Sequence, residues 1–278
     1  SGPNFDGHDY VSQALDKGAV AAIVSKVPEG IKKSEKLILV KDCENALNQL
    51  ADFARNRTKA EIVAVTGSVG KTITKDGLSI ALGASGLTHS TDGNLNNHYG
   101  APLTLSRLPE DSAYAAIELG MNHTGELYSL SKLIRPSVAI ITTIEAVHLE
   151  FFDSVASIAD AKAEVFAGLT GEKTAILNRD NIYFAYLSML DEEYGVGRII
   201  GFGADPEADV RLLNIRSNDL GTYVTADIRG KTISYNLNTP GRQNIINSLS
   251  ILAAVSALNA DVDKAAKALI NLSLTNGR

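Results

Sequence analysis

The chain has 278 residues, of which 45% are hydrophobic and 21% are charged, and its net charge is −6. This length and composition support one large domain or a domain with a smaller companion, and they exclude a disordered or fibrous protein. The acidic balance excludes a broad basic surface, so we expect no nucleic-acid partner and expect any anionic ligand to be bound locally.

The first predicted elements are a helix from residue 9, strands over 20–24 and 37–40, and a helix over about 45–56. The polar and basic stretch 55–59 follows and is the best candidate for a domain boundary. The sequence therefore predicts a domain of residues 1–59 and a second domain of residues 60–278.

Apolar strands alternate with helices after this boundary, with strands over 62–65, 114–117, 138–141, 175–177 and 199–201. Such alternation predicts an α/β fold, with a mostly parallel sheet covered by helices on both faces. Between residues 209 and 237 the pattern changes to short strands around turns, which indicates an antiparallel addition at the edge of the sheet. Two helices, over about 243–258 and 262–271, close the chain.

The segment TGSVGKT at residues 66–72 connects an apolar strand to a helix. Glycines in such a loop allow backbone amides to face a phosphate group, and the helix N-terminus adds positive potential. Lys71 is expected to reach the terminal phosphates, and the Thr72 hydroxyl is expected to bind Mg²⁺. The alternative is a tight turn with an incidental Gly-Lys-Thr, which the agreement of motif and context disfavours. The spacing departs from the usual phosphate loop, since Val65 stands where the first glycine is expected.

Glu118 and His148 follow two of the predicted strands, and ligands of open α/β sheets gather beyond the carboxyl ends of strands. A carboxylate and an imidazole are suitable Mg²⁺ ligands or activators of a phosphate-associated group. An isolated Glu or His is more often an ordinary surface or satisfied polar residue. Their position downstream of a phosphate loop is what favours a functional role.

Lys162 lies within the apolar stripe of a predicted helix over 154–169, because Ile158, Val165 and Phe166 share its face. Asp160 and Glu164 are expected to point the other way. A buried unpaired ammonium costs several kcal/mol, so Lys162 must be paired, have a lowered pKa or be chemically modified. The competing interpretation is that its stem packs while its ammonium reaches the solvent at the rim.

The chain carries six runs in the order found in MurF-type ligases, and it resembles that family over nearly its whole length: TGSVGKT, GNLNNHYGAPLTL, ELGMNHTGEL, RPSVAIITTIEAVHLEFFDS, IADAKAEVF and PGRQNIINSL. The resemblance implies the central ATP-binding domain of a Mur ligase, preceded by part of a smaller α/β domain that binds the UDP substrate. It also implies a cytoplasmic monomer that uses ATP and two Mg²⁺ ions, without membrane insertion.

The resemblance assigns residue roles position by position. It implies an ATP site formed by Gly67, Ser68, Val69, Gly70, Lys71, Thr72, Asn247 and Arg278. It implies Mg²⁺ ligands at Thr72, Glu118, His148 and Lys162, the last as a carbamate, and catalytic roles for Lys71, Glu118, His148 and Lys162. Asn96 and Asn97 are expected to face the substrate, UDP-MurNAc-tripeptide, which is joined to D-Ala-D-Ala through an acyl phosphate.

The resemblance further implies that the start of the N-terminal domain and the whole C-terminal domain are missing, so we expect this chain not to complete turnover alone. Two other functions are alternatives. One is another ligase of the Mur or folylpolyglutamate type, and the other is a non-catalytic ATP-binding fragment.

Overall fold

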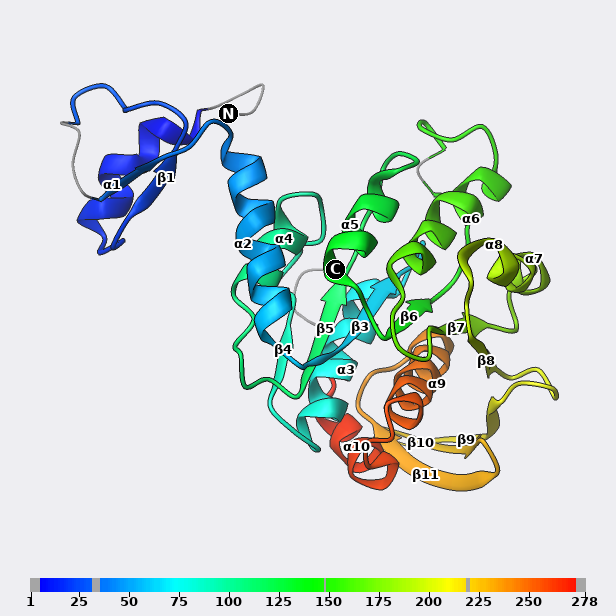
Figure 1. Cartoon of the computed structure of the whole chain (residues 1–278). Helices are drawn as coiled ribbons and strands as arrows, with labels where there is room; N and C mark the ends of the chain where they lie inside the picture. The colour runs from blue at the N-terminus through cyan, green and yellow to red at the C-terminus, as the bar shows by residue number, and fades with distance from the viewer. Residues whose placement is uncertain (1–5, 32–35, 148, 219–220, 274–278) are drawn as a thin grey trace.

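The computed structural model describes residues 6–31, 36–147, 149–218 and 221–273 (Figure 1). Its α-helices are α1 (Val11–Asp16), α2 (Cys43–Arg57), α3 (Lys71–Gly83), α4 (Gly100–Ser106), α5 (Glu126–Ile134), α6 (Val155–Ala163), α7 (Phe184–Met189), α8 (Asp191–Tyr194), α9 (Arg242–Ala257) and α10 (Val262–Ala268). Short 3-10 helices cover Gly7–Tyr10, Glu164–Gly168 and Leu269–Asn271. Its strands are β1 (Ala22–Val24), β2 (Leu37–Leu39), β3 (Glu61–Thr66), β4 (Thr88–Ser90), β5 (Tyr114–Glu118), β6 (Val138–Ile141), β7 (Thr174–Asn178), β8 (Arg198–Gly203), β9 (Val210–Asn218), β10 (Gly221–Ile228) and β11 (Lys231–Leu237).

The large sheet has the strand order β11-β10-β9-β8-β7-β6-β3-β5-β4 across the described residues. The strand pairs from β9 to β4 are parallel, whereas β10 pairs antiparallel with both β9 and β11. The predicted mostly parallel sheet and its antiparallel addition at one edge are therefore confirmed. The edge strand β4 was not predicted.

Both faces of this sheet are buried, as the composition of β3 illustrates. Val63 and Val65 belong to a core formed with α3, α9 and α10, while Ile62 and Ala64 belong to a second core formed with α2 and α4–α7. Successive side chains of a strand point to opposite faces, so a strand buried on both sides has a continuous apolar sequence. This explains the uninterrupted apolar run that precedes the phosphate loop.

A separate two-stranded parallel sheet of β1 and β2 lies near the N-terminus, and α2 connects it to the rest of the chain (Figure 1). Helix α2 packs against α4 and α5. Arg55 fastens it there, because its guanidinium donates hydrogen bonds to the carbonyls of Ile134 at 2.8 Å and Arg135 at 3.0 Å. Helix α2 thus packs on the large sheet's helices, and the division after residue 59 stays a prediction.

Strand β3 lies between β5 and β6 in the sheet, although β5 and β6 both follow it in the chain. In open α/β sheets the point where the strand order reverses leaves a crevice outside the carboxyl ends of the strands, where ligands bind. The segments that follow β3, β5 and β6 therefore converge at one place.

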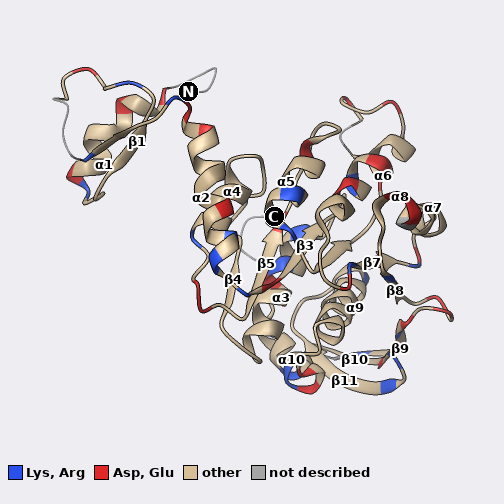
Figure 2. Ribbon diagram, in the orientation of Figure 1, with Lys and Arg blue, Asp and Glu red and all other residues tan. Residues whose placement is uncertain are grey.

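Charged residues of both signs are interspersed along the ribbon in the view of Figure 2. This distribution is what we expect if any anionic ligand is bound at a local site and not on a broad basic surface. Within the part of the chain that the structure describes, no helix has the length and apolar character needed to cross a bilayer.

Candidate active site

The loop between β3 and α3 depends on two glycines with positive φ. Gly67 has φ 142° and Gly70, the N-cap of α3, has φ 88°. A Cβ on Gly67 would lie 2.0 Å from Thr142 Oγ1, and a Cβ on Gly70 would lie 2.3 Å from Asn247 Nδ2. Both positions therefore exclude a side chain for steric as well as conformational reasons.

The loop is held against the segment that follows β6. The Ser68 amide donates to the Thr143 carbonyl at 2.9 Å, and the Thr142 hydroxyl donates to the Val69 carbonyl at 2.6 Å. The Ser68 hydroxyl also bonds both the carbonyl and the amide of Glu145. The role of residues 142–145 was not predicted. Their position directly after a strand that neighbours β3 is the signal that could have indicated it.

Lys71 begins α3 and reaches back over the loop, where its ammonium donates to the Gly67 carbonyl at 2.8 Å. This places a positive charge beside the backbone that a phosphate would approach. An ammonium beside the amides at the start of a helix is an arrangement that can bind an anion, and the role of Lys71 in binding ATP phosphates stays a prediction.

Glu118 is the last residue of β5, and it pairs in register with Val65, two residues before Gly67. Its side chain is 1% exposed. One carboxylate oxygen, Oε1, accepts a hydrogen bond from Asn96 Nδ2 at 2.7 Å, whereas Oε2 is buried without a partner among the described residues. A buried carboxylate oxygen without a hydrogen-bond donor lowers the stability of the fold, and a bound cation would compensate for the missing donor. This oxygen is therefore a suitable cation ligand.

Asn96 therefore contacts Glu118, a role that sequence reasoning did not include. The Asn96 carbonyl also accepts a hydrogen bond from the Gly120 amide at 2.8 Å, which ties the loop before α4 to the end of β5. The neighbouring Asn97 caps α4, because its Oδ1 accepts from the Gly100 amide at 2.8 Å. The expectation that these two asparagines face a substrate stays a prediction.

Lys162 is 2% exposed, as the periodicity of the sequence predicted, so the alternative of an ammonium at the solvent rim is wrong. Burial, and then repulsion from the Lys71 ammonium, lower the pKa of Lys162 from 10.5 to about 7. The two lysines thus interact electrostatically, and close to neutral pH a substantial fraction of Lys162 is an uncharged, nucleophilic amine.

The expected outward orientation of Glu164 is wrong. Glu164 is 6% exposed, and its carboxylate accepts hydrogen bonds from the amides of Gly125 at 2.6 Å and Tyr128 at 3.1 Å. The α-helix ends at Ala163, and the chain continues as a 3-10 turn, so the helical period no longer gives the direction of the next side chain. Glu164 instead caps the N-terminus of α5.

Asn247 lies in α9 with 1% exposure, against Gly70 of the loop. Its Oδ1 accepts from Gln243 Nε2 at 3.4 Å, and its Nδ2 is buried without a partner among the described residues. A buried amide group beside the phosphate loop can donate a hydrogen bond to a bound nucleotide.

His148 and Arg278, two further predicted site residues, lie outside the described residues. In the described ranges no group of three or more His, Cys, Asp or Glu side chains is placed to hold a metal ion. This agrees with the way Mg²⁺ is usually bound in phosphate sites, through one or two carboxylates together with phosphate oxygens and water. The buried Oε2 of Glu118 fits such a site, and Thr72 as a further ligand stays a prediction.

A family model described as the Mur ligase middle domain matches residues 65–255. This range contains the whole phosphate loop, β5, α6 and most of α9, which are the elements that build the site. The chain belongs to the Mur ligase family.

Within that family the chain is similar to ligases of the MurF type. It is 37% identical over 99% of its length to the UDP-N-acetylmuramoyl-tripeptide--D-alanyl-D-alanine ligase of Rickettsia prowazekii. It is 38% identical over 100% of its length to the ligase of the same name from Escherichia coli. The resemblance to MurF-type ligases is therefore confirmed. The chain spans 61% and 60% of the length of these two relatives.

Solved structures of MurF-type ligases are similar to this fold. A UDP-N-acetylmuramoylalanyl-D-glutamyl-2,6-diaminopimelate--D-alanyl-D-alanyl ligase from Acinetobacter baumannii superimposes with a TM-score of 0.87, at 29% identity, covering 100% of this chain and 60% of that one. The MurF ligase of Thermotoga maritima in complex with ADP superimposes with a TM-score of 0.76, at 25% identity, covering 96% of this chain and 61% of that one.

Proposed function

We propose that the protein containing this chain is an ATP-dependent ligase of peptidoglycan precursor synthesis that joins D-Ala-D-Ala to UDP-MurNAc-tripeptide. One observation carries this proposal: the buried Glu118 carboxylate, beside the strand that leads into the phosphate loop, has one oxygen without a partner among the described residues. The names of the relatives support the choice of substrates, and the geometry of the site supports the use of ATP. The name of the Acinetobacter baumannii ligase gives a tripeptide that ends in 2,6-diaminopimelate, an amino acid whose side chain carries a second amine and a second carboxylate.

The proposed reaction activates a carboxylate. A terminal carboxylate oxygen of the tripeptide attacks the γ-phosphorus of ATP, and ADP departs, leaving an acyl phosphate. The neutral amine of D-Ala-D-Ala then attacks the acyl carbon, a proton is lost from nitrogen, and phosphate departs as the amide forms. The loop amides and the Lys71 ammonium hold the phosphates and stabilise the charge that accumulates on them. Asn96 keeps the Glu118 carboxylate in position.

Mg²⁺, when bound, neutralises phosphate charge as the two anions approach each other. We assign its first site to Glu118, because its buried Oε2 has no partner among the described residues, and to Thr72, because of its place in the loop motif. A second ion at His148 and Lys162 is part of the proposal. Asn247 and Arg278 are proposed to contact the nucleotide.

Lys162 is proposed to act as a carbamate. Its neutral amine nitrogen would form a bond to the carbon of CO₂ and lose a proton, giving an anion in place of a buried cation. Two observations support this: Lys162 is 2% exposed, and no charge among the described residues raises its pKa. An anion beside Mg²⁺ is stable where a buried ammonium is not. Electron density at the side chain in crystals grown with bicarbonate, Mg²⁺ and nucleotide tests it, and an unmodified Lys162 turned to solvent contradicts it.

We also propose that residues 1–59 are part of a UDP-substrate domain and that residues 60–278 form the ATP-binding domain of a cytoplasmic monomer. The separate sheet of β1 and β2 supports the first point. The single cysteine supports a reducing compartment.

A coupled assay tests the function. Phosphate release by the whole protein that contains this chain is measured with ATP, Mg²⁺, UDP-MurNAc-tripeptide and D-Ala-D-Ala, and the amide product is identified by mass spectrometry. The 278-residue chain alone is measured beside it, and we expect it not to complete turnover. We expect release only when both substrates are present, and expect Lys71→Ala to abolish it while Lys267→Ala, at an exposed position in α10, does not. Preference for a single amino acid over the dipeptide would favour another ligase of the family, and ATP binding without any amide would favour a non-catalytic protein.

A further inference from the structure

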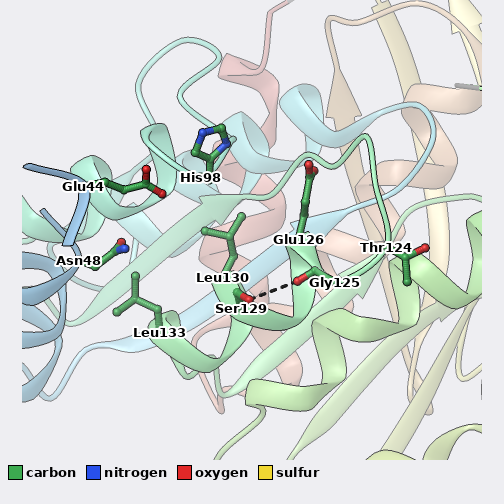
Figure 3. Close-up of a pocket in the computed structure, with 9 residues that line it drawn as sticks. All are labelled: Glu44, Asn48, His98, Thr124, Gly125, Glu126, Ser129, Leu130 and Leu133. Carbon is green, nitrogen blue, oxygen red and sulfur yellow. Dashed lines mark hydrogen bonds between the residues drawn. The ribbon is translucent and has the colours of Figure 1, made fainter. Parts of the chain in front are cut away.

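The loop between β5 and α5 holds an imidazole against a carboxylate. His123 Nδ1 lies 3.1 Å from Oε1 of Glu126, the first residue of α5. The His123 side chain is 62% exposed, so a ligand can reach it. Thr124, Gly125 and Glu126, which follow His123, line a cavity of about 490 Å³, and Figure 3 shows the Glu126 side chain among the residues around it. The imidazole and its carboxylate therefore border open space.

This loop is tied to two segments of the candidate active site. It begins directly after Glu118, the last residue of β5, and His123 comes five residues later. The Gly125 amide donates a hydrogen bond at 2.6 Å to the carboxylate of Glu164, which is two residues after Lys162 in the chain. His123 is thus held between the segment that carries Glu118 and the segment that carries Lys162.

A ring contact joins His123 to a third segment, the one between β6 and α6. The rings of His123 and Phe151 are 5.0 Å apart between centroids and tilted by 58°. Phe151 is three residues after His148 in the chain, and the same segment begins with Thr142, whose hydroxyl bonds the phosphate loop. His123 therefore lies where the segments after β5 and β6 meet, at the crevice in which ligands of such sheets bind.

The neighbouring carboxylate determines which nitrogen of the His123 ring can accept a proton. Oε2 of Glu126 accepts a hydrogen bond from the Asn122 amide at 2.8 Å, which fixes the carboxylate. Burial raises the pKa of Glu126, but hydrogen bonds from the Asn122 amide and from His123 outweigh burial, and the pKa lies below its ordinary value. An ionised carboxylate only accepts hydrogen bonds, so Nδ1 is the donor, and Nε2 of the neutral ring keeps a lone pair. A carboxylate in this position orients an imidazole and stabilises the imidazolium that forms when Nε2 takes a proton.

The second half of the proposed reaction requires a proton acceptor. The ordinary pKa of an α-amine is about 8, so most of the incoming dipeptide is protonated at neutral pH, and its nitrogen must lose protons to form an amide. Glu118 and Lys162 are assigned to Mg²⁺ in the proposed function, and Lys71 is assigned to the phosphates. An imidazole is the side chain that most often serves as a general base.

We propose that His123 is the general base of amide formation, accepting at Nε2 the proton that the attacking nitrogen of the dipeptide loses. The nitrogen lone pair forms the bond to the acyl carbon, the bond from that carbon to the phosphate oxygen breaks, and phosphate departs with the electron pair. The proton moves from nitrogen to Nε2, and the imidazolium later releases it to water. Glu126 positions the ring. The inference rests on the proposed function, in which an amine attacks an acyl phosphate.

Two nucleophiles separate this role from a structural one. The whole protein that contains this chain receives ATP, Mg²⁺ and UDP-MurNAc-tripeptide, together with either D-Ala-D-Ala or hydroxylamine at neutral pH. Hydroxylamine is a weak base that is mostly unprotonated at this pH, and it attacks acyl phosphates without a catalyst to give a hydroxamate. We expect His123→Ala to lower the rate of amide formation about a hundred-fold, as for the loss of a general base, and to preserve the rate of hydroxamate formation.

Two further variants and a rescue sharpen the test. Glu126→Gln should lower amide formation by less than His123→Ala does, because the imidazole remains. Added imidazole should restore part of the amide rate to His123→Ala. Lys267→Ala, at an exposed position in α10, is the control and should preserve both rates.

The outcomes distinguish this inference from the proposed function. An equal loss of both rates in His123→Ala would mean that the residue is structural, and it would overturn the inference. An unchanged rate of amide formation would also overturn it, and both results leave the proposed function standing. A natural protein that forms neither product overturns the proposed function, and this inference with it. If His123→Ala fails to bind an ATP analogue, His123→Gln, which keeps a polar side chain of similar length, decides in its place.

Discussion

Replacing Lys162 by methionine measures how much a buried ammonium destabilises this fold. Burial, and then the charge of Lys71, lower the pKa of Lys162 from 10.5 to about 7. A shift of this size corresponds to about 5 kcal/mol of unfolding free energy when the lysine is charged in both states. Methionine keeps a long, unbranched side chain in the same space without the charge.

The sign of the pH dependence follows from the lowered pKa. Between pH 7 and pH 10.5 the unfolded chain holds the Lys162 proton and the folded chain does not, so the free energy of unfolding rises with pH. Below that window both states hold the proton, and the whole destabilisation is present. Lys162→Met should therefore stabilise the protein most at about pH 6, by up to about 5 kcal/mol.

Urea unfolding in buffers free of carbonate and metal provides the measurement. The free energies of unfolding of the natural chain and of Lys162→Met are compared at several pH values between about 6 and 10, the range in which the lysine titrates. Lys267→Met, at an exposed position of α10, is the matched control and should follow the natural chain. Parallel pH curves for the natural chain and Lys162→Met would refute the reasoning.

Three other substitutions address the loop, the carboxylate and the cap. Gly70→Ala places a methyl group 2.3 Å from Asn247 Nδ2 at a positive φ, so we expect a loss of about 1–3 kcal/mol of stability and weaker binding of a fluorescent ATP analogue. Gly83→Ala, where a Cβ meets nothing within 4 Å, is its control, and equal effects would contradict the steric argument. Asn96→Ala removes the hydrogen-bond donor to Glu118, and we expect it to weaken Mn²⁺ binding by about ten-fold, as for the loss of a hydrogen bond to a charged group. Electron paramagnetic resonance measures the affinity for Mn²⁺. An unchanged affinity would show that Asn96 does not position Glu118. Glu164→Gln should lower the unfolding free energy by about 1 kcal/mol through the loss of charge at the α5 N-terminus, and a neutral result in urea would show that the cap needs no charge.

The sequence predicted most reliably those features that follow from the pattern of neighbouring residues alone. The apolar run before TGSVGKT predicted β3, and the loop glycines predicted the turn, because no other residue fits their backbone angles and neighbours. The buried position of Lys162 also followed from periodicity, since its distance of four residues from Ile158 falls within the part of α6 that is regular. These predictions needed only short-range information.

Other features depend on contacts that periodicity does not report. Strand β4 has three residues of intermediate exposure, so it lacks the apolar run that identified the central strands. Glu164 was misplaced because the helical period was extended past Ala163, where the helix tightens. The link between Asn96 and Glu118 joins residues 22 positions apart in the chain, and only the fold brings them together.

The attachment of α2 has a consequence for movement. Arg55 bonds the carbonyls of Ile134 and Arg135 at the C-terminal end of α5, and α2 packs on α4, so we expect α2 to stay with the helices that cover the large sheet. A rotation of the small β1–β2 sheet would have to occur in the short link before α2, at residues 40–42. Such a hinge would reorient the β1–β2 sheet while the contacts of α2 with α4 and α5 stay intact.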